Sequence, residues 1–170
     1  MEDPQLLPFY SLDTSAVING RRDIFLPETF GPVWEGIEQM IALGQVRAVD
    51  EVRIELAKKS DEAKRWAASC MGFFVPLSRD IQLATSEILA AHPRLLGMGG
   101  PRNSADPFVI ALAYARGGTV VTQETPRNVT MPRIPDVCEA MCIPWLTLPQ
   151  FVNQQGWQMV RRLAAAEPPG

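Results

Sequence analysis

The sequence has no apolar run that approaches the ~20 residues a helix needs to cross a bilayer. Its start, Met1-Glu2-Asp3-Pro4, is acidic and lacks the basic residues that open a secretory signal peptide. Cysteine is scarce: there are 3, an odd number with no CxxC pair, which is typical of a reducing compartment. We therefore expect a cytoplasmic protein with no membrane partner.

Histidine is almost absent, since His92 is the only one and it precedes Pro93. A serine or cysteine hydrolase would need this histidine as its base, beside a nucleophile motif that the chain lacks. A zinc site would need more ligands than one histidine and the dispersed cysteines supply. Cys138 and Cys142 lie four residues apart, which places them on one face of a predicted helix, and core packing is the expected role for both.

The chain also lacks an excess of positive charge: its formal net charge is -3, so broad electrostatic attraction to nucleic acid is not expected. A nucleic-acid enzyme of this composition would depend on local basic clusters, a metal ion, or both. Short clusters of this kind are ordinarily solvated surface. They are Arg21-Arg22, Lys58-Lys59 with Lys64-Arg65, and Arg127 with Arg133.

Length and apolar content fit one globular domain, with 170 residues of which 46% are hydrophobic. We expect a single domain over 1-170, with a core over about 8-152 and a helical lobe at about 60-100. Strands are predicted at Phe9–Leu12, Gln45–Val49, Thr119–Thr122 and Ile143–Leu146. Helical patterns between them imply crossover connections, hence an α/β fold with a parallel sheet of about four or five strands.

The helical patterns have recognisable starts and stops. Helices are predicted at Ala16–Ile18 after an Asp13-Thr14-Ser15 cap, at Val33–Leu43, from Asp50, from Asp61 to Cys70, from Ser78 to near His92, from Ser104 or Asp106 to Tyr114, from Ile134 to near Met141, and from Pro149. Asn19-Gly20 is predicted to turn and Pro27–Pro32 to form a loop.

Four acidic residues mark the junctions between these elements: Asp13, Glu55, Asp106 and Glu124. Acids at strand ends and helix starts can converge at one edge of a parallel sheet, where α/β folds place their sites. Converging carboxylates repel each other unless a cation joins them. The pattern therefore indicates a hard divalent metal and chemistry at phosphate. Taken singly, Asp13 and Asp106 are better explained as helix caps, and it is the joint placement of the four acids that favours a site.

The motifs around these acids resemble PIN-domain ribonucleases. Leu12-Asp13-Thr14-Ser15-Ala16-Val17-Ile18 is similar to the opening signature of that family, and Glu55 in Asp50–Leu56 is similar to its second acid. Ala105–Ala113 resembles the third motif, and Val120–Glu124 resembles the fourth, where the family more often has aspartate. The segments Phe30–Val49, Ile134–Cys138 and Ile143–Trp145 resemble a poorly characterised branch of the PIN-like superfamily whose relatives look like bacterial toxin–antitoxin toxins.

This resemblance implies a three-layer PIN-like fold and hydrolysis of RNA with Mg²⁺ or Mn²⁺. By the same resemblance, Asp13 and Asp106 would hold the first ion, Glu55 would ligate or orient its water, and Glu124 would serve a second ion or an outer shell. The supporting hydroxyls would be Thr14, Thr122 and Ser15, which could fix carboxylate rotamers. Glu51 and Asp136 are the alternates: Glu51 lies one turn before Glu55, and Asp136 could equally cap a helix.

The implied function is an endoribonuclease acting as the toxin of a toxin–antitoxin pair, with RNA as substrate, a cognate antitoxin as partner and a homodimer as a possible assembly. The antitoxin could place an apolar helix on the surface or an arginine into the acidic site. Two alternatives stay open: a catalytically inactive PIN-like binding module, and a metal-dependent DNA nuclease. Metal binding separates the first from the prediction, and substrate preference separates the second.

Overall fold

A parallel sheet forms the middle of the computed structural model, which describes residues 7–96, 105–128 and 130–157. Its strands are β1 (Tyr10–Leu12), β2 (Val46–Val49), β3 (Phe74–Val75), β4 (Thr119–Val121) and β5 (Trp145–Leu146). Their order is β3-β2-β1-β4-β5, and every pair is parallel. The central strand β1 therefore has β2 on one side and β4 on the other.

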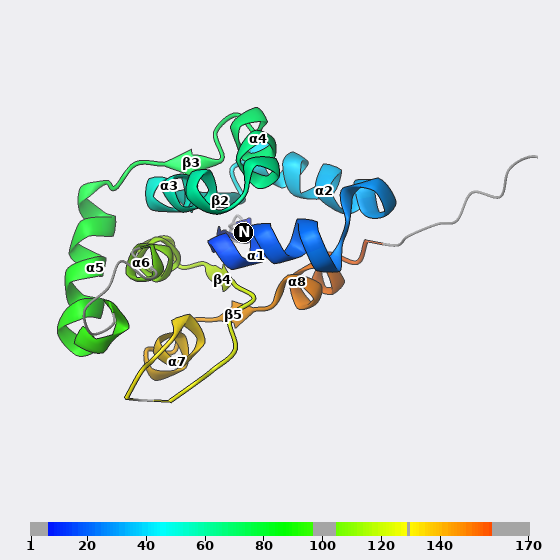
Figure 1. The fold of residues 1–170 in the computed structure, drawn as a ribbon. Helices are drawn as coiled ribbons and strands as arrows, with labels where there is room; N and C mark the ends of the chain where they lie inside the picture. Colours follow the sequence, from blue (N-terminus) through cyan, green and yellow to red (C-terminus); the bar gives the residue numbers. More distant parts are fainter. Residues whose placement is uncertain (1–6, 97–104, 129, 158–170) are drawn as a thin grey trace, which may run out of the picture.

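Helices cover the sheet on both sides, which gives the three layers that were expected. They are α1 (Thr14–Asn19), a π-helix η1 (Gly20–Ile24), α2 (Pro27–Ala42), α3 (Asp50–Lys59), α4 (Asp61–Ser69), α5 (Arg79–Ala91), a 3₁₀ turn η2 (Pro93–Leu96), α6 (Asp106–Arg116), α7 (Ile134–Ala140) and α8 (Leu148–Gln154). Helices α5, α6 and α7 lie to one side of the strands, and α2 and α8 lie to the other (Figure 1). In the described part of the chain, no helix is long and apolar enough to span a membrane.

The core explains why the short strands hold together. Leu12, Val49 and Val121 are fully buried, as expected for strands that are covered on both faces. Helix α6 packs on β1, β2 and β4 at once. Because α6 begins at Asp106 and β1 and β4 end near Asp13 and Glu124, the packing brings these segments to the same edge of the sheet.

The strand β3 is the element that sequence patterns did not indicate, because it is only two residues long. The four predicted strands are present, and Phe74 and Val75 add the fifth by pairing with Ala48 and Val49. This strand lies inside the region predicted to be a helical lobe, so part of that region belongs to the sheet. Gly72 with φ of +79° turns the chain from α4 toward it.

Two predicted breaks in the first helical region are wrong. Asn19-Gly20 does not turn, because Gly20 has helical φ and ψ and continues into η1. A Cβ at Gly20 would collide with Leu148 and Trp34, so this glycine serves close packing. The segment predicted as a loop over 27–32 is helical, with Pro27 in the first turn of α2, where a missing N–H costs little. A break at Phe30 then accommodates Pro32.

Smaller corrections concern caps and a cysteine. Val49, and not Asp50, is the N-cap of α3, and Ala105 is the N-cap of α6; Ser104 lies outside the described residues. Cys138 is buried as expected, but Cys142 is exposed, because α7 ends before it and its φ is +55°.

Candidate active site

Asp13 sits where β1 ends, and it caps α1. Its Oδ2 accepts hydrogen bonds from the backbone N of Ser15 at 3.3 Å, from Ser15 Oγ at 2.5 Å and from Thr122 Oγ1 at 2.9 Å. Burial raises the pKa of the Asp13 carboxyl, the negative charge of Glu55 adds to the rise, and these hydrogen bonds oppose it. The structure therefore confirms Asp13 as a helix cap, and its role in a metal site stays a prediction.

Two hydroxyl groups join the end of β1 to the end of β4. Ser15 Oγ accepts from the backbone N of Gln123 at 2.9 Å, and Thr122 Oγ1 accepts from the backbone N of Glu124 at 3.1 Å. Since both hydroxyls also contact Asp13, its carboxylate and the backbone of Glu124 are held by one network. These are the positions where the sequence predicted supporting residues.

Glu55 reaches the site from the second turn of α3. Thr14 Oγ1 donates to its Oε2 at 2.7 Å, and the backbone N of Ala105 donates to its Oε1 at 3.2 Å. Lys59 Nζ lies 3.6 Å from Oε2, one turn further along the same helix. Glu55 is therefore tied to the start of α1 and to the residue that precedes α6.

Asp106 is the first residue of α6, and its surroundings are the most unfavourable to charge. Burial, followed by the negative charges of Asp13, Glu124 and Glu55, raises the pKa of its carboxyl to about 10. Lys59 acts in the opposite direction. Asp13, Asp106 and Glu55 are 3%, 4% and 7% exposed, so little solvent screens them from each other.

Glu124 is half-buried and is held from the opposite side by α7. Its Oε2 accepts from the backbone N of Ile134, the first residue of that helix, at 3.0 Å. Burial raises the pKa of the Glu124 carboxyl, with the charge of Asp13 as the next cause. The glutamate side chain thus spans the distance between the end of β4 and the start of α7.

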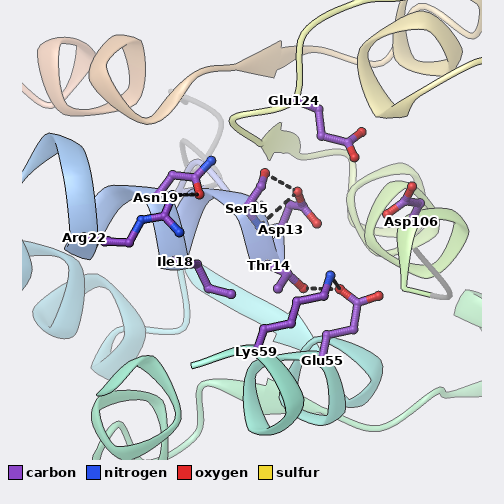
Figure 2. A pocket seen from close by; sticks show the side chains of 10 residues that line it. All are labelled: Asp13, Thr14, Ser15, Ile18, Asn19, Arg22, Glu55, Lys59, Asp106 and Glu124. Atoms are coloured by element: carbon purple, nitrogen blue, oxygen red, sulfur yellow. Dashed lines mark hydrogen bonds and ion pairs between the residues drawn. The ribbon is translucent and has the colours of Figure 1, made fainter. Parts of the chain in front are cut away.

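All four predicted acids line one pocket of about 270 Å³, and Figure 2 shows their carboxyl groups around a common space. The other lining residues are Thr14, Ser15, Ile18, Asn19, Arg22 and Lys59. Sequence reasoning missed Ile18 and Asn19, and it left Arg22 and Lys59 as ordinary surface charges. Their signal was proximity to the acids along the chain: Ile18 and Asn19 follow Asp13 on α1, and Lys59 follows Glu55 by one turn.

Neither alternate acid lines this pocket. Both oxygens of Asp136 accept from the backbone N of Arg127, and Oδ2 also accepts from the N of Arg133, which caps α7. Glu51 lies on the first turn of α3, where its Oε2 is buried. The geometry therefore favours Glu55 over Glu51 and gives Asp136 a structural role.

The donor chemistry of the pocket fits a hard divalent cation, because four carboxylates and several hydroxyls face it. Among the described residues, however, no group of three or more His, Cys, Asp or Glu side chains is arranged so that it could hold a metal ion. Mg²⁺ commonly keeps several waters and takes only one or two carboxylates, so an open arrangement is compatible with it. The raised pKa values of Asp13, Asp106 and Glu124 mark the place where positive charge would relieve repulsion most.

The sheet order and the three layers define an α/β domain with a PIN-like fold. The structure of VapBC2 from Rickettsia felis bound to a DNA fragment from their promoter shares this fold, with a TM-score of 0.50 and 12% identity over 82% of this chain and 98% of that one. FitAcB from Neisseria gonorrhoeae is similar at 17% identity, with the same coverage and a TM-score of 0.49.

The chain belongs to the family described as a domain of unknown function, DUF4411, whose model matches residues 10–159. A comparison with curated proteins finds no match. The family match covers all four acids of the pocket. At these identities the structural likeness concerns the fold alone.

Proposed function

We propose that this protein is a metal-dependent endoribonuclease. The observation that carries the proposal is the convergence of four acids on one pocket, three of them with raised pKa values. Structural carboxylates are normally paired with cations or exposed to water, whereas repelling, desolvated ones are typical of functional sites. The resemblance of the four motifs to PIN-domain ribonucleases supplies the reaction class.

In this proposal Asp13 and Asp106 bind the first Mg²⁺ or Mn²⁺ ion. A bound divalent ion would activate water and neutralise charge on the phosphoryl oxygens. Thr122 and Ser15 hold the Asp13 carboxylate in one orientation. Thr14 does the same for Glu55, which is positioned to orient a water or to join as a ligand. Glu124, anchored to α7 through Ile134, serves at the far side of the pocket.

The test is cleavage of a mixed RNA pool and of DNA of matched sequence with Mn²⁺ or Mg²⁺, and EDTA as the negative control. Asp13→Asn and Asp106→Asn should each abolish cleavage while circular dichroism shows an intact fold. Asp136→Asn is the matched control, because this acid lies outside the pocket, and it should cleave at the wild-type rate. Activity that survived both pocket variants would show that the pocket is not the active site. Cleavage of DNA alone would show that RNA is not the substrate.

We further propose that the protein acts as a toxin that a cognate antitoxin neutralises, a role that rests on the resemblance of its motifs. The acidic pocket is suited to receive an arginine of such a partner. Expression of the intact chain should arrest bacterial growth, and Asp13→Asn should relieve the arrest. Harmless expression of an intact protein that cleaves RNA in vitro would contradict the toxin role but not the nuclease.

A further inference from the structure

The candidate active site is lined unevenly. Asp106 and Glu124 stand on one side, and Asn19 and Arg22 stand on the other, with Lys59 beside Glu55 between them (Figure 2). A polyanion that approaches the pocket is therefore repelled by one wall and attracted by the other. The attracting wall is formed by α1, η1 and the end of α3.

Arg22 projects from η1 into solvent at the pocket rim, and its side chain is 66% exposed. Its Nε and Nη2 donate to the adjacent Asp23 at 2.6 to 2.9 Å, and Nη2 lies 3.4 Å from Asn19 Oδ1. An exposed pair of this kind contributes little net free energy, so a phosphate can compete for the guanidinium. Guanidinium groups bind phosphate through paired N–H donors, which makes Arg22 suited to such an exchange.

Lys59 supplies the second positive charge. Its side chain is half-exposed, and its Nζ lies 3.6 Å from Glu55 Oε2. An ammonium group binds a phosphate as a mobile point charge, and a flexible stem lets it contact Glu55 and a ligand in turn. Its neighbour Lys58 is also exposed but does not line the pocket.

The remaining basic clusters are less suited to this role. Arg21 is buried between Trp34 and Trp66 and bonded to Glu62, so it is committed to the fold. Neither Arg127 nor Arg133 lines the pocket. Of the basic clusters in the sequence, only two thus contribute a charge to the pocket wall, each through its second residue.

We propose that Arg22 and Lys59, with the amide of Asn19, bind a backbone phosphate of the RNA next to the one that is cleaved. This inference rests on the proposed function, since it assigns the strand a path across the pocket from the Glu124 wall to the Arg22 wall. The contact positions the substrate and offsets the repulsion of the acids, so it acts mainly on binding.

The experiment measures binding of a short fluorescein-labelled single-stranded RNA by anisotropy, with Ca²⁺ in place of Mg²⁺ and over a series of salt concentrations. Arg22→Ala and Lys59→Ala should each weaken binding by roughly three- to tenfold. The double variant should reduce the slope of log K against log salt by about 0.7, the value for one phosphate contact on a single strand.

Each variant has a matched control. Arg53→Ala removes an arginine that is 61% exposed and paired with Asp50, much as Arg22 is paired with Asp23, but that lies outside the pocket. Lys58→Ala removes the neighbour of Lys59. Both controls should bind RNA as the wild type does.

The outcomes separate this proposal from the nuclease itself. Binding that depends on Arg22 and Lys59 in a protein that cleaves no RNA would support the phosphate contact and overturn the proposed function. If the wild type cleaves RNA, but the Arg22 and Lys59 variants bind RNA as well as Arg53→Ala and Lys58→Ala do, only the phosphate contact would be overturned. Absence of RNA binding by the wild type would overturn the proposed phosphate contact.

Discussion

Two clusters of buried charged side chains in this molecule differ in how their charges are compensated. At the α1–α4 side, the Arg21 guanidinium carbon lies 4.6 Å from the Trp34 ring centroid and 4.8 Å from that of Trp66, and its Nε and Nη2 bond to Glu62. At the carboxyl edge of the sheet, Asp13, Asp106 and Glu124 lie together with raised pKa values. In the first cluster the guanidinium has aromatic and carboxylate partners, although its Nη1 makes no hydrogen bond. In the second cluster, burial and repulsion between the carboxylates outweigh the hydrogen bonds that Asp13 and Glu124 accept.

The difference shows which cluster the fold needs. A buried charge that only supports structure is stabilised by partners, as Arg21 is by two aromatic faces and a carboxylate. Acids whose pKa values are raised by burial and by each other reduce stability in their charged form, so they persist where a ligand adds positive charge. Substitutions in the two clusters should therefore move stability in opposite directions.

Arg21→Ala should produce the largest loss of stability, about 3–4 kcal/mol, because it removes two cation–π contacts, an ion pair and the packing of the stem. Urea unfolding followed by tryptophan fluorescence measures it. Arg22→Ala is the matched control from the adjacent exposed position and should change stability by less than about 0.5 kcal/mol. Equal effects of the two variants would show that the contacts of Arg21 with Trp34 and Trp66 contribute nothing.

Addition of Mn²⁺ should stabilise the wild type by about 2.7 kcal/mol at a concentration 100 times Kd, because the ion binds only where the acids converge. Thermal unfolding with and without the ion measures this change. Asp13→Asn should remove most of the stabilisation, and Asp136→Asn should leave it intact. If Asp136→Asn removed the stabilisation by Mn²⁺ instead, the ion would bind at Asp136 and not in the pocket.

Sequence patterns predicted these two clusters unequally. The acids were found because each stands at a strand end or helix start, and in a parallel sheet such positions share one edge. The partners of Arg21 were not found, since Trp34 and Trp66 come from α2 and α4, and their meeting depends on tertiary packing. Similarly, nothing local distinguishes Arg21 from Arg22; the turn of η1 buries one and exposes the other.

The same limit explains the errors in the fold. The strands β1, β2, β4 and β5 were predictable from short apolar runs between turn residues. Strand β3 has two residues, too few for any periodicity, and it exists because β2 offers an edge to pair with. The prolines of α2 indicated a loop, yet Pro27 begins a helix and the break at Phe30 admits Pro32.

Asp106→Asn should raise the stability of the metal-free protein by about 2 kcal/mol near pH 8, because it removes a carboxyl that the fold strongly disfavours in its charged form. The pKa of Asp106 is about 10 in the folded chain against 3.8 ordinarily, so the folded state holds a proton that the unfolded state releases. Stability of the wild type should therefore fall as the pH rises from about 4 toward about 10.

Urea titrations in EDTA at several pH values measure this slope. The fall should be shallower in Asp106→Asn, with the remainder due to Asp13 and Glu124, whose pKa values are also raised. A wild-type stability that rose across the same range would mean that these carboxyls are compensated after all. The comparison with the Arg21 cluster would then lose its basis.

The smallest effects should come from the two acids at α7, and they should differ in kind. Asp136→Asn weakens the bonds from the backbone N of Arg127 and Arg133, and it should cost about 1 kcal/mol without changing cleavage. Glu124→Gln keeps an oxygen to accept from Ile134 N and removes a carboxyl whose pKa is raised, so stability should not fall, while cleavage falls about tenfold as a charge leaves the pocket. Urea unfolding and initial cleavage rates on both variants measure this. If both variants lost stability and neither lost activity, Glu124 would be a second cap of α7, and the site would consist of Asp13, Glu55 and Asp106.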